Sequence, residues 1–312
     1  MKAAMKAGRS VCAFIGFVFL ISVALVCATV LAEELSDYVR GGMRLAVSAI
    51  IPSVFPFMIL ADFITASIDF STMPHLSSLF ERSFHISRRA LAPFIIGTLA
   101  GFPVGAKMAS ELYKSGAISK EDAEACIAIS SSPSLAFVVS GVGAAMWGNV
   151  GYGVLLYLSV VSASVFFGLI SRKKALVSDV SRDRISKFTL LRSVEKATES
   201  SLGIIGVISI FSVFSGLILE LPASENFAHF ILPFFEVGGA CAYLAKAALP
   251  DFTLLVLTAF SLGFSGLSVH LQIRGAISGT DLSYRRFFIA KALQGALSAA
   301  IMSTLLLLAN RC

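Results

Sequence analysis

GTLAGFPVGAK, residues Gly97–Lys107, interrupts an apolar segment that extends over residues 91–113. Gly101, Pro103 and Gly105 stand within five residues of one another. A proline removes a helical hydrogen bond and kinks or ends a helix, so this stretch predicts a break in the middle of the segment. If the segment lies in a membrane, such a break is tolerated only where its backbone faces protein or a watery cavity.

The composition places the whole chain in a membrane. Of its 312 residues, 56% are hydrophobic and 14% are charged, and the mean hydropathy is +0.85. A soluble domain of this size needs more charge to cover its surface, and several apolar runs reach the roughly 20 residues that a spanning helix requires. We therefore expect an all-α, polytopic membrane protein with apolar segments near 11–32, 43–67, 91–113, 123–146, 149–171, 200–220, 227–248, 251–273 and 286–309.

Positive charge indicates how the segments cross. The net charge of +6 is spread over short loops beside apolar segments, which is a topology signal rather than the clustered charge of a nucleic-acid binder. The basic segment 172–199 carries eight cations, and the positive-inside rule places it in the cytoplasm with the N-terminus. If 91–113 spanned fully, this segment would lie outside. The rule therefore favours a hairpin that enters and leaves on one side.

Two further stretches carry local predictions. Residues 11–32 follow Lys2, Lys6 and Arg9, and we expect an uncleaved first transmembrane helix, although VLAEE resembles a signal-peptidase site. Residues 70–90 are mixed in polarity, and we expect a short amphipathic helix at the membrane interface.

A repeated tetrapeptide suggests two related halves. GAIS occurs at Gly116–Ser119 and Gly275–Ser278, and a Gly-Phe pair precedes each copy, at 101–102 and 263–264. We expect both glycines to cap helix C-termini and both serines to stand near the next helix start. We divide the chain into an N-terminal helix (1–40), a first repeat (41–171), a basic linker (172–199) and a second repeat (200–312).

The orientation of the second repeat stays open at this stage. Inverted repeats with broken helices are a recurrent transporter plan. Strict inversion would place the basic residues of the second half outside, whereas the charge rule prefers them inside. If 227–248 spans the membrane, these residues return inside, but the symmetry between the halves is then imperfect. These residues are Arg274, Arg285, Arg286 and Lys291.

The first candidate solute site is the broken stretch itself. Breaking a helix frees backbone amides and carbonyls, and a half-helix N-terminus favours an anion. The residues expected to contact solute here are Gly101, Phe102, Pro103, Gly105 and Lys107. Glu111 lies four residues after Lys107, so it is either a coupling-ion candidate or the partner of an ordinary ion pair with Lys107.

Two more polar stretches are candidates. In ISSSPS, the hydroxyls beside Pro133 form either a solute-binding notch or a healed kink, and the residues concerned are Ser131, Ser132 and Ser134. In the second half the candidates are Ser265, Ser268 and His270, the histidine being either a titrating group or a packing residue. Glu236, beside two glycines, is a second coupling-ion candidate or a helix cap.

Other chemistries lack the residues they need. The sequence has no Walker, GxSxG, HExxH or dinucleotide-binding motif, so we expect no enzyme and no cofactor. Its five cysteines are scattered without metal-ligand spacing, so we expect no metal site. The expected partners are the lipid bilayer and a small-molecule solute, with no nucleic acid. Whether the protein forms a homo-oligomer is left open.

Two long stretches carry a family resemblance. GFPVGAKMASELYKSGAISKEDAEACIAISSSPSLAFVVSGVG (101–143) and LGFSGLSVHLQIRGAISGTDLSYRRFFIAKALQGALSA (262–299) resemble the nucleoside-recognition, or Gate, domains of sporulation integral membrane proteins. The nearest branch resembles the stage V sporulation protein V family of dipicolinic acid importers. The resemblance covers roughly residues 40–300 and implies inverted repeats with re-entrant hairpins, distantly like those of concentrative nucleoside transporters.

The resemblance also implies a function. It implies import of dipicolinic acid into the forespore during sporulation, across the outer forespore membrane, with 101–107 and 265–270 lining the pathway. The alternative is a non-transporting membrane scaffold or assembly factor for the spore envelope. The residues themselves do not distinguish dipicolinate from another small polar or anionic solute.

Overall fold

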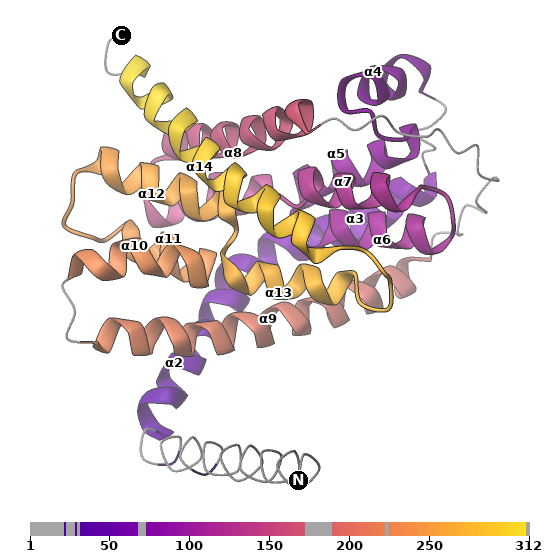
Figure 1. Cartoon of the computed structure of the whole chain (residues 1–312). Helices are drawn as coiled ribbons and strands as arrows, with labels where there is room; N and C mark the ends of the chain where they lie inside the picture. The colour runs from indigo at the N-terminus through magenta and orange to yellow at the C-terminus, as the bar shows by residue number, and fades with distance from the viewer. Residues whose placement is uncertain are drawn as a thin grey trace, which may run out of the picture.

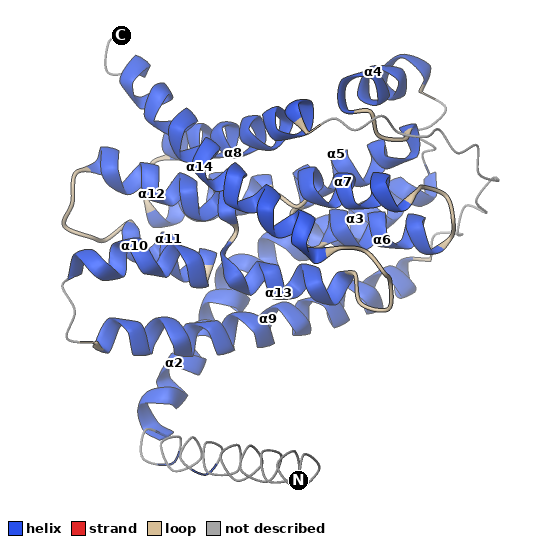
Figure 2. Ribbon diagram, viewed as in Figure 1, coloured by secondary structure: helices blue, strands red, loops and turns tan. Residues whose placement is uncertain are grey.

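The structure is built from helices. The computed structural model describes residues 22, 29, 32–67, 73–171, 189–221 and 225–309, and no strand occurs among them (Figure 2). Within these residues, four helices are long and apolar enough to cross a membrane: Val150–Ile170, Leu190–Glu220, Asp251–Ala276 and Tyr284–Ala309. A bent pair, Ala32–Ile50 with Val54–Leu60, makes a fifth if it counts as one span. The expected all-α, multi-pass membrane protein is confirmed.

The first half contains one hairpin and one broken helix. It begins with α2 (Ala32–Leu45), the π-helical turn η1 (Ala46–Ile50), α3 (Ile51–Ser67), α4 (Pro74–Phe84) and the short turn η3 (Arg88–Ala90). Next, α5 (Leu91–Ala100) and α6 (Val104–Lys114) form a hairpin that turns at Gly101–Pro103. A broken helix follows as α7 (Lys120–Ser130) and η4 (Phe137–Met146), and α8 (Val150–Ile170) is continuous.

The second half repeats this order. After α9 (Leu190–Glu220), α10 (Glu225–Phe235) and α11 (Val237–Leu244) form a hairpin that turns at Glu236. A broken helix follows as α12 (Asp251–Phe264) and α13 (Gly266–Ala276), and α14 (Tyr284–Ala309) is continuous. In Figure 1 the α5–α6 hairpin opens to the right and the α10–α11 hairpin opens to the left, with both tips toward the middle. The halves are thus arranged in opposite directions.

This order corrects the register that GAIS suggested. The first GAIS follows α6, the second arm of a hairpin, whereas the second follows from the end of α13, the second piece of a broken helix. Gly101-Phe102 therefore corresponds to the hairpin tip at Glu236, and the break at 131–134 corresponds to the break at Ser265. Matching Gly101-Phe102 to Gly263-Phe264 was wrong, because the shared GAIS sequence reflects the similar residue preferences of two helix ends and not equivalent positions in the two halves.

Some expectations fall outside the described residues. These include most of segment 11–32 and residues 172–188 of the basic linker. The described part of that segment is already regular, because α9 begins at Leu190. The division into an N-terminal helix, two repeats and a linker stays a prediction. The expected short helix in 70–90 is present as α4, which buries Phe80 and Phe84 while leaving Leu79 exposed.

Polar contacts fix which loops share an end of the molecule. Lys120 Nζ lies 2.8 Å from Asp281 Oδ2, and Tyr113 donates to Asp281 Oδ1 at 2.6 Å. Arg286 lies 3.8 Å from Glu124. The loop 277–283 therefore lies beside the loop 115–119, on the right in Figure 1. Both loops flank the hairpin α5–α6 rather than the hairpin α10–α11.

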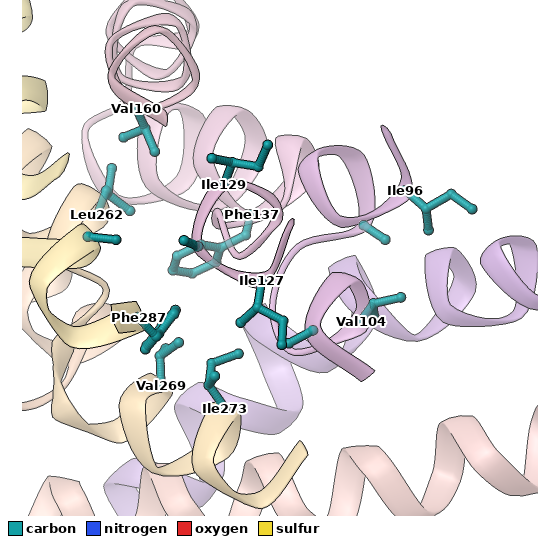
Figure 3. Packing of buried hydrophobic residues seen from close by; sticks show 14 of the residues in the cluster. Ile96, Val104, Ile127, Ile129, Phe137, Val160, Leu262, Val269, Ile273 and Phe287 are labelled. Carbon is teal, nitrogen blue, oxygen red and sulfur yellow. The ribbon is translucent and has the colours of Figure 1, made fainter. Parts of the chain in front are cut away.

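The apolar core joins the two broken helices. Ile127 and Phe137 stand on either side of the first break, and Val269 follows the second break. Figure 3 shows these side chains together with Phe287 of α14, all buried in one cluster. Burial of this apolar surface holds the two halves together at the level of the breaks.

Candidate functional site

The tip of the first hairpin packs against the first break. Phe102 N donates to Ser132 O at 2.9 Å. A Cβ on Gly105 would stand 2.8 Å from Ser130 O, and one on Gly101 would stand 2.6 Å from Ser134 N. No side chain fits at either position, so both glycines serve close contact between the hairpin and the broken helix.

The tip of the second hairpin packs in the same way against the second break. Glu236 is buried and caps α11, accepting from Gly238 N at 2.9 Å and also from Gly239 N. Gly266, with a positive φ of 61°, lies so close that a Cβ would stand 3.1 Å from Phe235 O. Glu236 is therefore a helix cap at the hairpin tip, which is one of the two roles that the sequence left open.

Both tips and both breaks line one small central cavity of about 20 Å³. Two of its buried polar atoms, Ser268 Oγ and Gln272 Oε1, have no hydrogen-bond partner among the residues that the structure describes. Orphaned buried polar atoms are costly and commonly mark a place where water or a ligand binds. The lining consists of Ile50, Val54, Phe102, Ser134, Phe137, Ile204, Ile208, Glu236, Val237, Ser268, Val269 and Gln272.

A larger pocket of about 400 Å³, which we call the vestibule, lies beside the first hairpin. It is lined from α3, α6, α9 and the end of α13, and it includes Lys107 and Glu111. Lys107 Nζ donates to Ser200 Oγ at 2.7 Å, and the ion pair between Lys107 and Glu111, one of the two alternatives for these residues, is not among those that the described residues form. The structure thus separates Lys107 and Glu111 from the central cavity.

The serines of the first break are bound by the protein itself. Ser131 Oγ donates to Ile127 O at 2.7 Å, and Ser134 Oγ accepts from Phe137 N at 3.1 Å. Ser132 Oγ lies 3.1 Å from Ser164 Oγ of α8. These contacts are those of a break whose free backbone groups are satisfied by hydroxyls. Only Ser134 of the three also lines the central cavity.

His270 is held on both ring nitrogens. Its Nδ1 lies 2.9 Å from the Tyr284 hydroxyl, and its Nε2 lies 3.1 Å from Phe264 O. The ring of Phe264 lies 4.8 Å away, centroid to centroid. His270 therefore bridges α13, α14 and the second break as a packing residue. Ser265 forms that break with a positive φ of 73° and donates its hydroxyl to Leu262 O.

Sequence reasoning missed a polar cluster on α14. Lys291 is completely buried, and its Nζ donates to Gln294 Oε1 at 3.0 Å. Gln294 Nε2 donates to Ala128 O at 2.8 Å, and Ser164 Oγ donates to Gln294 Oε1 at 3.3 Å. The available signal was the spacing of Lys291 and Gln294 within an otherwise apolar helix, which places both on one face.

Comparison with known proteins gives one match. The chain is 24% identical, over an alignment of 327 residues, to the "Sporulation integral membrane protein YlbJ" of Bacillus subtilis (strain 168), covering 89% of this chain and 79% of that protein. No protein-family profile matches the chain, and no solved structure matches it. The similarity and the apolar helices together support a multi-pass membrane protein whose exposed apolar side chains contact the lipid bilayer.

Proposed function

We propose that this chain is a secondary transporter of a small polar or anionic solute, which crosses at the junction of the two hairpin tips and the two helix breaks. The observation that carries the proposal is the central cavity, where tips and breaks from both halves meet around orphaned polar atoms. Broken helices that meet between inverted repeats are a usual design for a solute site in transporters. The proposal involves no chemical reaction on the solute.

The arrangement suggests how access alternates. Each hairpin tip contacts the neighbouring break, through Phe102 N on Ser132 O in the first half and through the close approach of Gly266 to Phe235 in the second. A hairpin that moves away from its break would open the cavity toward its own end of the molecule. The vestibule lies beside the first hairpin and reaches Pro103 and Val104, so it supports a path from that end.

For the solute we propose dipicolinate, imported into the forespore across its outer membrane. The support is the resemblance of residues 101–143 and 262–299 to dipicolinic acid importers, together with the similarity to a protein named for sporulation. Dipicolinate is a small planar dicarboxylate, which suits a protein-lined junction with half-helix ends nearby.

A non-transporting scaffold for the spore envelope is the second candidate. One observation favours it: at about 20 Å³, the central cavity holds about one water molecule and not a dicarboxylate. A transporter closed on both sides has the same feature. This structure is therefore compatible with both candidates, and a measurement of transport distinguishes them.

Uptake into vesicles containing only this protein separates the candidates. We expect vesicles preloaded with dipicolinate to exchange it for labelled dipicolinate outside. Ser268→Leu fills the cavity and should lower exchange by at least about tenfold, because a solute displaced by about 1 Å loses productive contacts. Thr304→Leu is the matched control on the exposed face of α14 and should exchange at the wild-type rate.

A folding control accompanies the exchange measurement, and two outcomes would count against the proposal. Both variants should elute as single species in detergent. An absence of exchange by the wild-type protein for dipicolinate and for other small carboxylates and nucleosides would favour the scaffold. Equal exchange by Ser268→Leu and Thr304→Leu would remove the central cavity as the pathway.

A further inference from the structure

Within the described part of the chain, one lysine nitrogen is completely buried and has no carboxylate paired with it. Lys291 has 0% exposure, and its hydrogen bond is to the neutral amide of Gln294. Among the described residues, no ion pair joins it to a carboxylate. A protonated amine taken from water without a counter-ion costs several kcal/mol, so such a residue is expensive for the fold.

The surroundings of Lys291 offer it only partial compensation. Gln294, its partner, donates to Ala128 O in the last turn of α7. The C-terminus of a helix carries a partial negative charge, which favours a nearby cation. This partial charge compensates the ammonium charge much less than a carboxylate would. The ammonium form of Lys291 is therefore left with most of its charge uncompensated at this position.

The cluster also lies next to the parts that the proposed mechanism moves. Gln294 and Ser132 both bond to Ser164 Oγ, and Ser132 O accepts from Phe102 N at the first hairpin tip. A chain of hydrogen bonds therefore runs from α14 through the first break to the hairpin. Displacing the hairpin would break the hydrogen bond at the far end of this chain, from Phe102 N to Ser132 O.

We propose that Lys291 and Gln294 form an anchor for a carboxylate group of the transported solute. The inference rests on the proposed transport function and gives its solute class, a small carboxylate anion. On binding, Lys291 Nζ donates to the carboxylate, and Gln294 Nε2 exchanges Ala128 O for a solute oxygen. Charged hydrogen bonds of this kind are about twice as strong as neutral ones, and here they also supply the missing counter-charge.

The first test measures binding and stability on the same variants in detergent. Lys291→Met keeps the length and apolar stem but removes the nitrogen. We expect its affinity for dipicolinate, measured by calorimetry, to fall by at least about tenfold, the effect of losing one charged hydrogen bond. We expect its melting temperature to stay equal or rise, because an uncompensated buried charge is gone. Lys246→Met, at an exposed site, is the matched control.

A second variant supplies Lys291 with a carboxylate from the protein itself. Gln294→Glu places a carboxylate beside Lys291, where the wild-type distance to Gln294 Oε1 is 3.0 Å. We expect the affinity for dipicolinate to fall, because the internal carboxylate takes the place of the solute. The variant gains an ion pair with Lys291 but loses the donation from Gln294 Nε2 to Ala128 O, so the two effects on its melting temperature oppose each other. Acetate and pyridine serve as further probes: acetate should compete with dipicolinate in the wild-type protein, and pyridine should not.

Two outcomes would overturn the anchor. One is wild-type affinity in Lys291→Met. The other is a lower melting temperature in Lys291→Met, with binding lost only in proportion to folded protein, which would make the cluster a structural support. Because binding is measured apart from exchange, the anchor can fail while dipicolinate exchange by the wild-type protein still stands. If the wild-type protein binds dipicolinate in a Lys291-dependent way but does not exchange it, the transport function is refuted and the anchor still stands.

Discussion

Glycines beside the two breaks allow neighbouring helices to come into close contact and do not make room for a solute. Gly101 and Gly105 face Ser134 and Ser130 across the first break. In the second half, a Cβ on Gly263 would stand 2.9 Å from Gln294 O on α14. The sequence indicates correctly that these positions need close backbone approach. It does not indicate what approaches, because the approaching groups are distant along the chain.

Substituting Gly105 should separate the hairpin from the break. In Gly105→Ala the new methyl would stand 2.8 Å from Ser130 O, which belongs to the backbone and cannot rotate away. We expect a loss of about 1–3 kcal/mol in the free energy of unfolding, the usual effect of overpacking. Gly203→Ala is the control, because nothing lies within 4 Å of its Cβ. That change should stabilise α9 by about 0.5–1 kcal/mol.

Denaturant titration in detergent, followed by circular dichroism, measures both changes. Equal stability of Gly105→Ala and Gly203→Ala would contradict the close contact between hairpin and break. Exchange of labelled solute should fall in Gly105→Ala alone.

Ionisable residues were the hardest to rank from sequence. Lys107 stands close to Gly105 along the chain, yet α6 begins at Val104 and the lysine points to the vestibule. Glu236 is better placed, since it lines the central cavity itself. In the sequence, Lys291 is visible only as a positive charge that bears on topology. Its burial depends on three other helices packing around α14, which no local pattern contains.

At the level of elements, the two GAIS copies show why similar letters need not be equivalent positions. Gly116 has a positive φ of 75° and ends the hairpin arm, and Ser119 Oγ caps α7 by accepting from Asp122 N at 3.1 Å. In the second copy Gly275 is still helical, and Gly279 takes the positive φ of 73° instead. Helix ends select glycine and serine wherever they occur, so a match at two ends says little about duplication.

The loop contact between the halves should depend on pH. The Lys120 ammonium, and then the Tyr113 hydroxyl, hold the pKa of the Asp281 carboxyl below its ordinary value. In turn, hydrogen bonding to Asp281 raises the pKa of Lys120. Because the folded-state pKa of Asp281 is lowered, its contribution to stability is present above its unfolded pKa, about 3.9, and is lost as pH falls through the lower folded value.

Asp281→Asn tests this contact. We expect the variant to melt below the wild-type protein by a gap that is constant from about pH 5 to 8. The gap should narrow as pH falls below about 4 and close below the lowered folded-state pKa of Asp281, where the carboxyl becomes protonated in the folded wild-type protein. Glu195→Gln, on an exposed position of α9, should show no such gap. A gap that widens toward acid would mean that the aspartate acts through something other than Lys120 and Tyr113.

At the scale of the whole molecule, the corrected register removes the conflict over orientation. With Gly101-Phe102 matched to Gly263-Phe264, inversion placed the basic loop of the second half outside. When the two hairpins are matched instead, inversion itself returns α13 to the end where α6 and α7 meet, and Lys120 pairs there with Asp281. The inverted arrangement and the positive-inside rule then agree.

The sequence therefore predicted the first hairpin, because glycine, proline and charge all pointed to it. The second hairpin was hidden, since α10 and α11 meet at a single glutamate, and the nearby Gly238 and Gly239 lie inside α11 rather than at the turn. Pro233 lies inside α10, where it gives a misleading signal. A cap that binds backbone amides through its own side chain leaves almost no trace in hydropathy.

Labelling of single cysteines tests the inverted arrangement. We expect Ser115→Cys and Ser278→Cys to react from the same side of sealed vesicles, because loops 115–119 and 277–283 are joined by Lys120 and Asp281. Val150→Cys and Ala248→Cys should react from the opposite side, where α8 and α12 begin in Figure 1. A membrane-impermeant maleimide, added before and after detergent, measures the sidedness in a background whose five native cysteines are replaced by serine or alanine.

The pattern discriminates between the two registers. If residues 227–248 spanned the membrane as one helix, Ala248→Cys would react from the same side as Ser115→Cys. A hairpin that turns at Glu236 keeps residue 248 on the side where α9 ended, opposite residue 115. Labelling of 248 and 115 from one side would therefore refute the second hairpin, and with it the opposed arrangement on which the central pathway depends.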